Sequence, residues 1–152
     1  MRFKYMFLGL LILIMVTSVG AIAAADDYES VGDYTFDIPD GYQVGDKDDV
    51  SVGMALDENH TVLVYQLDSD SDISLFQTML EAAGCEFTDG EDLKVGNFDV
   101  SQSTYKFEDT QGNFFICSDG GKPILVADGM PASEELPAAE DSPAYQVVSS
   151  LE

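Results

Sequence analysis

The first 25 residues decide how much of this chain is left to fold. Two basic residues precede an apolar run from residue 6 to residue 19, which ends in the small-residue stretch 21–25. A positive region, an apolar core and A-x-A cleavage sites after Ala23 or Ala25 are the layout of a secretory signal peptide. Removing residues 1–25 from the 152-residue chain leaves 127 residues, which is enough for one domain with a hydrophobic core.

An uncleaved anchor is the alternative interpretation of this segment. Residues 6–25 form 20 largely apolar positions, long enough to cross a bilayer if they are never removed. The small residues at the end of the segment and the abrupt change to aspartate favour cleavage. In both cases we expect the rest of the protein to be extracytoplasmic, either secreted or held at the cell surface.

Acidic residues outnumber basic ones so strongly that some classes of partner are excluded. After residue 25 the chain has four lysines, no arginine and 29 Asp and Glu, a formal charge of −25. Nucleic acids and anionic membrane surfaces need Lys and Arg to bind them, so neither is expected as a partner. Cationic partners, divalent cations, or solubility in a salty medium are compatible with this charge, and a solvated acidic surface is the favoured interpretation.

Two cysteines, Cys85 and Cys117, remain after the signal segment. An even count in an exported chain favours one disulfide, here closing a loop of 33 residues. The chain-entropy model gives such a loop about 3 to 4 kcal/mol of stabilisation. Two buried free thiols are the alternative. The spacing does not fit a zinc ligand set.

Turn signals and hydrophobic periodicity divide residues 32–152 into one α+β domain, with residues 26–31 as a short tail. Alternating or apolar runs predict antiparallel strands at 32–38, 50–56, 61–67, 93–95, 98–107, 113–118 and 123–128. Helical spacing predicts a helix over 73–83, capped by Ser71 or Asp72 and stopped by Gly84. Ser142-Pro143 predicts the start of a last helix over 144–151. Two helices on a mostly antiparallel β-sheet make an α+β sandwich.

Two sequence features resemble a known group. The first strand ends in Phe36-Asp37-Ile38-Pro39-Asp40-Gly41-Tyr42, and the closing helix ends in Val147-Val148-Ser149-Ser150-Leu151. With the element order between them, this resembles the PsbP/Mog1-like α/β/α sandwich group of small exported domains, over about residues 32–151. The group shares no catalytic residues, and its members are mostly binding or accessory proteins. The resemblance therefore implies a fold and disfavours an enzyme.

The alternating aspartates Asp68, Asp70 and Asp72 match the ligand positions 1, 3 and 5 of an EF-hand calcium loop. Ile73 stands where that loop needs glycine, and Met79 where it needs glutamate, so a full EF-hand is excluded. A weak calcium site is the functional interpretation, and a solvated turn with a helix cap is the favoured one. No other cofactor is expected.

Asn59, His60 and Thr61 form an N-glycosylation sequon at a predicted hairpin tip. Asn59 is thus a candidate glycosylation site in a host that glycosylates. His60 is the only histidine, and we expect it to be a surface residue rather than a general base, because carboxylates are too abundant here for a neighbouring one to be informative.

Phe114 and Phe115 are adjacent in a predicted strand, so their side chains point to opposite faces of the sheet. An outward phenylalanine marks a binding surface unless a helix covers that face. We expect helices on both faces.

These features predict an exported, highly acidic, non-catalytic binding or accessory domain, monomeric, whose partner is a protein, a small ligand or a cell-envelope component. A calcium-dependent or salt-adapted structural surface protein is the first alternative. A hydrolase with an unrecognised site is the second.

Overall fold

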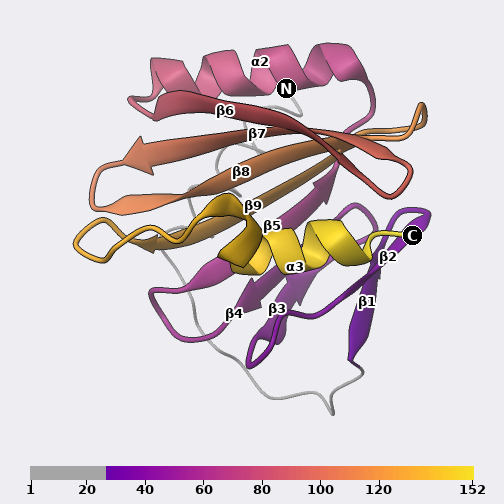
Figure 1. Cartoon of the computed structure of the whole chain (residues 1–152), viewed down its shortest axis with the longest axis horizontal. Coiled ribbons are helices and arrows are strands. Elements are labelled where there is room, and N and C mark those ends of the chain that lie inside the picture. Colours follow the sequence, from indigo (N-terminus) through magenta and orange to yellow (C-terminus); the bar gives the residue numbers. More distant parts are fainter. Residues whose placement is uncertain (1–26) are drawn as a thin grey trace.

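The computed structural model describes residues 27–152, and the expected signal segment, with its cleavage sites, lies outside the described residues. Within the described part, no helix is long and apolar enough to cross a membrane. The chain folds into a seven-stranded sheet, a separate two-stranded sheet and two α-helices (Figure 1).

The large sheet is antiparallel throughout and has the strand order β3-β4-β5-β9-β8-β7-β6. Hairpins join β3 to β5 along one half, and a helical crossover then carries the chain to the far edge, from which β6 to β9 return to the middle (Figure 1). The last strand, β9, therefore pairs with β5. The strands are β3 (Gln43–Lys47), β4 (Ser51–Ala55), β5 (Thr61–Gln66), β6 (Glu86–Val95), β7 (Phe98–Phe107), β8 (Thr110–Ser118) and β9 (Ile124–Pro131).

The expected tail at residues 26–31 is wrong, because Tyr28–Val31 form strand β1. This strand pairs residue for residue with β2 (Tyr34–Asp37), and Val31 is only 1% exposed. Gly32 and Asp33 make the two-residue turn between them, with Gly32 at φ +56°, a conformation that favours glycine. Thr35 of β2 also exchanges two backbone hydrogen bonds with Glu152, which ties the chain end to this hairpin.

Helix α2 (Asp70–Ala82) begins three residues before the predicted start, with Ser69 as its N-cap residue. The Ser69 side chain makes no capping hydrogen bond, and the aspartates in the first turn, Asp70 and Asp72, are placed favourably for the helix dipole instead. Gly84 follows the helix at φ +104°, as the glycine stop predicts.

Helix α3 (Pro143–Ser150) confirms the predicted start: Pro143 is in the first turn, and the Ser142 hydroxyl accepts a hydrogen bond from the Tyr145 amide at 3.2 Å. A 3₁₀ turn, η1 (Ala139–Asp141), precedes it.

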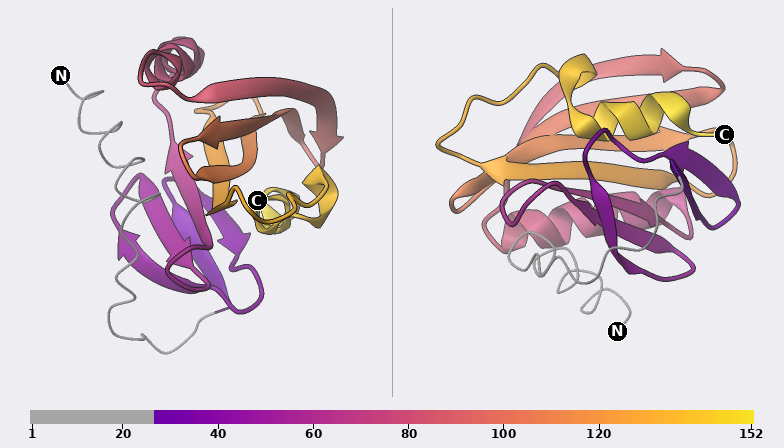
Figure 2. Two further views of the ribbon diagram at one scale, coloured as in Figure 1. Left: turned by 90° about the vertical axis from the view of Figure 1, so that its left-hand side faces the viewer. Right: turned by 90° about the horizontal axis from the view of Figure 1, so that it is seen from below.

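The two helices cover opposite faces of the sheet (Figure 2). Phe115 is fully buried in the cluster under α3, to which the β1–β2 hairpin also contributes. Phe114 is 2% exposed and lies in the second cluster, under α2. The two adjacent phenylalanines thus point to opposite faces, both covered, as the sequence predicts. The mostly antiparallel α+β sandwich is confirmed.

The predicted disulfide between Cys85 and Cys117 is wrong. Both cysteines are free and buried. Cys85 belongs to the cluster under α2 and Cys117 to the cluster under α3, so the sheet lies between them. A bridge needs Cβ atoms about 3.5–4.5 Å apart and pointing toward each other, which opposite faces of a sheet do not allow.

Strand β6 is much longer than the predicted strand at 93–95. It begins at Glu86 and pairs with β7 along its whole length, apart from a register shift between Asp89 and Asp92. Its first seven residues contain four acids and Gly90, and glycine and acidic residues are less frequent in strands than elsewhere. β6 is an edge strand, where charged side chains and bulges are common because they discourage pairing between molecules.

Candidate functional site

A histidine between two carboxylates is the main polar cluster at one end of the large sheet. The His60 Nδ1 atom lies 2.8 and 3.0 Å from the two carboxylate oxygens of Asp57, and its Nε2 atom lies 2.9 Å from Glu134 Oε2. Asp57 and His60 belong to the loop between β4 and β5. Glu134 comes from the loop between β9 and η1, 74 residues away in sequence.

Backbone contacts position each member of this cluster. The Asp57 carboxylate accepts hydrogen bonds from the amides of Asn59 and His60 at 2.8 and 2.9 Å, which fixes the hairpin loop in an Asx-type turn. On the other side, Gln111 Nε2 donates to the Glu134 carbonyl at 2.7 Å. The Asp57 carboxylate is therefore held by its own loop, whereas at Glu134 it is the backbone carbonyl that is held.

The electrostatics of the cluster favour the charged imidazole. Hydrogen bonds first to Glu134 and then to Asp57 raise the pKa of His60 above its usual value, although partial burial opposes this. In turn, the hydrogen bond from His60 is the main reason that the pKa of Asp57 is lowered. The His60 side chain is 25% exposed, so it is in contact with solvent.

Asp128 is a second titratable group near this end of the sheet, buried in β9 beneath the start of α3. Its carboxylate accepts hydrogen bonds from the Asn113 amide at 2.7 Å and from the Ala144 amide at 3.4 Å. Burial raises the pKa of Asp128 to about 6, against the opposing effect of these hydrogen bonds. The carboxylate joins β8, β9 and the N-terminus of α3, a structural role that occupies both oxygens.

The sequence analysis identified neither Glu134 as the partner of His60 nor Asp128 as a buried carboxylate. Asp128 follows the apolar run Ile124–Ala127, and an acid that extends such a run is the signal that could have marked it as buried. Glu134 gives no comparable signal, because nothing in the sequence distinguishes it from Glu135.

The arrangement around His60 is unlike that of a nucleophilic enzyme. A general base needs one ring nitrogen directed at a nucleophile, but both nitrogens of His60 contact carboxylates. The two thiols are equally unsuited, since burial raises the pKa of Cys85 to about 11 and that of Cys117 to about 12. The cluster can instead hold a proton and join two loops.

The three aspartates of the candidate calcium site take separate roles. Asp70 and Asp72 lie in the first turn of α2, and an oxygen of the Asp68 carboxylate lies 3.8 Å from the Nζ atom of Lys122, which belongs to the turn between β8 and β9. Over residues 27–152, no group of three or more His, Cys, Asp or Glu side chains is arranged to hold a metal ion. Asn59 is exposed in the loop between β4 and β5, where a glycan has access to solvent, and its glycosylation stays a prediction.

Thermal unfolding in different salts tests the calcium interpretation. With NaCl and CaCl2 at matched ionic strength, we expect both salts to raise the melting temperature by a similar few degrees over low salt, because each screens the repulsion among the excess carboxylates. A rise that calcium gives and sodium does not would mean preferential calcium binding to the folded state, and would contradict this expectation.

Comparison with known proteins bears on the fold. No family model and no curated protein matches the sequence. A crystal structure from Bacteroides thetaiotaomicron VPI-5482 matches 78% of this chain, with a TM-score of 0.49 and 14% identity, but this chain spans only 44% of that protein. The solution structure of cyanobacterial PsbP (CyanoP) from Synechocystis sp. PCC 6803 matches 90% of this chain and 98% of its own, with a TM-score of 0.52 and 18% identity. Because this second match covers nearly all of both chains, the fold of residues 27–152 is PsbP-like, as the resemblance predicted.

Proposed function

We propose that the protein is an exported, non-catalytic binding or accessory domain that works at the cell surface or in the extracellular space, and whose acidic surface binds a cationic partner. The secretory layout of residues 1–25 supports the location. The occupied ring nitrogens of His60 and the buried thiols support a role other than catalysis.

The imbalance of charge is the observation that carries this proposal. Against 29 acids, the chain after residue 25 has only four lysines, and three of them already contact its own carboxylates. These pairs are Lys47–Glu29, Lys94–Asp99 and Lys122–Asp68. Most of the acidic charge is thus uncompensated by the protein, and a surface of one sign attracts and steers partners of the opposite sign.

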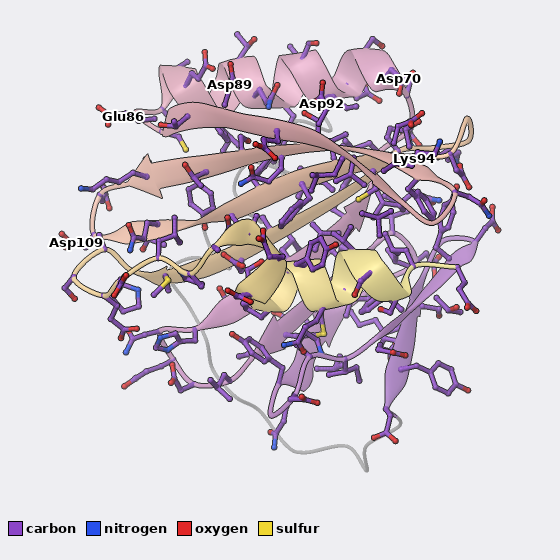
Figure 3. All side chains as sticks on the ribbon, in the orientation of Figure 1. Asp70, Glu86, Asp89, Asp92, Lys94 and Asp109 are labelled. Carbon is purple, nitrogen blue, oxygen red and sulfur yellow. The ribbon has the colours of Figure 1, made fainter. Side chains whose placement is uncertain are left out.

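Strand β6 is where we expect the partner to bind. Four of its ten residues are exposed acids, and within the described structure β6 pairs with β7 alone. Figure 3 shows three of these acids, Glu86, Asp89 and Asp92, spaced along the strand. A partner with lysines or arginines on an extended segment would contact several of these carboxylates at once.

Calorimetric titration of the protein with a synthetic oligolysine tests the proposal. We expect saturable binding with a defined stoichiometry that weakens as salt is raised, and no heat of binding with oligoglutamate. Neutralising the four β6 acids should weaken oligolysine binding about tenfold or more, at about 0.5 kcal/mol for each exposed ion pair lost. These substitutions are Glu86→Gln, Asp89→Asn, Glu91→Gln and Asp92→Asn.

A second variant with the same net charge distinguishes a binding site on β6 from nonspecific attraction to the overall negative charge. It removes four exposed acids on other parts of the surface, and should bind oligolysine nearly as well as the native protein. Its substitutions are Asp33→Asn, Asp40→Asn, Glu58→Gln and Glu140→Gln. Equal weakening in both variants would show that net charge alone attracts the probe and would reject β6 as the binding surface. Absence of saturable binding would reject the proposed function.

A further inference from the structure

His60 joins two loops that lie at the same end of the sheet and do not pair with each other. Its imidazole contacts Asp57 in the loop between β4 and β5, and Glu134 in the loop between β9 and η1. We propose that His60 is a proton-dependent latch, which holds the side chain of Glu134 against the β4–β5 loop only while the imidazole is charged. The inference is independent of the proposed binding function.

The number of N–H donors on the ring explains why the contact with both carboxylates depends on a proton. The imidazolium carries two N–H groups and can donate to both carboxylates, whereas the neutral ring carries one. Removing a proton therefore leaves a nitrogen lone pair facing a carboxylate oxygen at under 3 Å on one side of the ring. Such a contact is repulsive, so one of the two must open.

The surrounding contacts decide which side opens. Asp57 is held by two backbone amides of its own loop and stays in place, so Nδ1 keeps its proton. Glu134 has no such restraint on its carboxylate among the hydrogen bonds of the described residues, and its contact with Nε2 is the one to break. The backbone of this loop stays attached through Gln111, so the release concerns the Glu134 side chain and its immediate neighbours.

The charges that act on the imidazole come from two loops, and the other titratable groups near the cluster are Tyr42 and Asp128. Asp57 and Glu134 are the carboxylates that act on the imidazole. From the turn before β3, Tyr42 lies within the electrostatic reach of Asp57 and Asp128, and burial raises its pKa to about 12, so it stays neutral near physiological pH. Asp128 also titrates in the acidic range, so the test needs a variant that removes the latch and keeps Asp128.

Glu134→Gln is that variant, and Glu135→Gln is its matched control, because it makes the same change of charge one residue away. Nuclear magnetic resonance of the full-length protein gives the His60 pKa in all three forms. We expect it to lie above its usual value in the native protein and in Glu135→Gln, and to fall in Glu134→Gln, which loses the largest favourable contact.

Hydrogen exchange at position 134 reports on the loop itself, because this amide donates to the Pro131 carbonyl at 3.1 Å. After correction for intrinsic rates, we expect its protection in the native protein and in Glu135→Gln to fall about threefold as the pH rises through the His60 pKa. Glu134→Gln should show no such step. An unchanged His60 pKa in Glu134→Gln, or the same step in all three forms, would overturn the latch.

Discussion

Replacing Phe114 with alanine is expected to lower the free energy of unfolding by about 3 to 5 kcal/mol, the usual cost of removing a buried aromatic ring. The ring lies between the sheet and α2 and is 2% exposed. It stacks on Phe76 of α2 with the ring centroids 6.4 Å apart, and meets Phe87 of β6 edge-on at 5.2 Å. Alanine would leave a cavity between β8, the edge strand β6 and α2.

Urea unfolding measures this loss. The control is Leu75→Ala in α2, the helix that covers Phe114. Leu75 is 43% exposed, and the expected loss of unfolding free energy is under about 1 kcal/mol. Phe115→Ala should cost as much as Phe114→Ala, because Phe115 is fully buried on the other face, with its ring 6.1 Å from that of Tyr145 in α3. A small effect at either phenylalanine would contradict a sheet covered on both faces.

Replacing Asp128 with asparagine is expected to change how stability depends on pH. Burial raises the pKa of Asp128 to about 6, above its ordinary value of 3.8, so between these values the folded protein binds more protons than the unfolded chain. Stability contributed by this group is therefore present at low pH and lost as the pH rises. The shift corresponds to about 3 kcal/mol across that window.

The measurement is the difference in unfolding free energy between the native protein and Asp128→Asn, from pH 4 to pH 7. We expect the native protein to lose about 2 to 3 kcal/mol relative to the variant over this range. Asp141→Asn, an exposed aspartate two residues before α3, controls for the change in net charge and should show no such trend. A difference that is flat, or that grows in favour of the native protein with pH, would contradict a buried and destabilised carboxylate.

Much of the fold was predictable because local chemistry and tertiary structure agree. Alternation across Phe98–Phe107 predicted β7 with its observed ends, and Ser142-Pro143 predicted the start of α3. The two adjacent phenylalanines predicted side chains on opposite faces of the sheet, and the two predicted helices led us to expect both faces to be covered. In each case a pattern within ten residues specifies what the element must bury.

Other features were missed because they depend on residues far apart in sequence. Most of β6 has a composition that is poor for a strand, and it is ordered by pairing with β7. β1 was overlooked because Tyr28–Val31 is a short segment whose partner, β2, and the chain end beside it supply its stability. The disulfide prediction failed because the parity of cysteines does not say on which face of a sheet each one lies.

The candidate site could be predicted least. His60 was recognised as a surface residue, but its bridge to Glu134 spans 74 positions and depends on the pairing of β5 with β9. In a chain with 29 acids, no pattern in the sequence selects that glutamate. Only the register of the strands brings the two loops to the same end of the sheet.

The most direct test of the central claim, a localised acidic binding surface on a PsbP-like domain, is to follow the backbone amide resonances of the protein during titration with oligolysine. We predict saturable shifts concentrated on β6 and its neighbour β7, with the amides around Asp128 unchanged. Small shifts spread evenly over all exposed acidic segments, without saturation, would contradict the claim and would mean that the charge serves solubility alone.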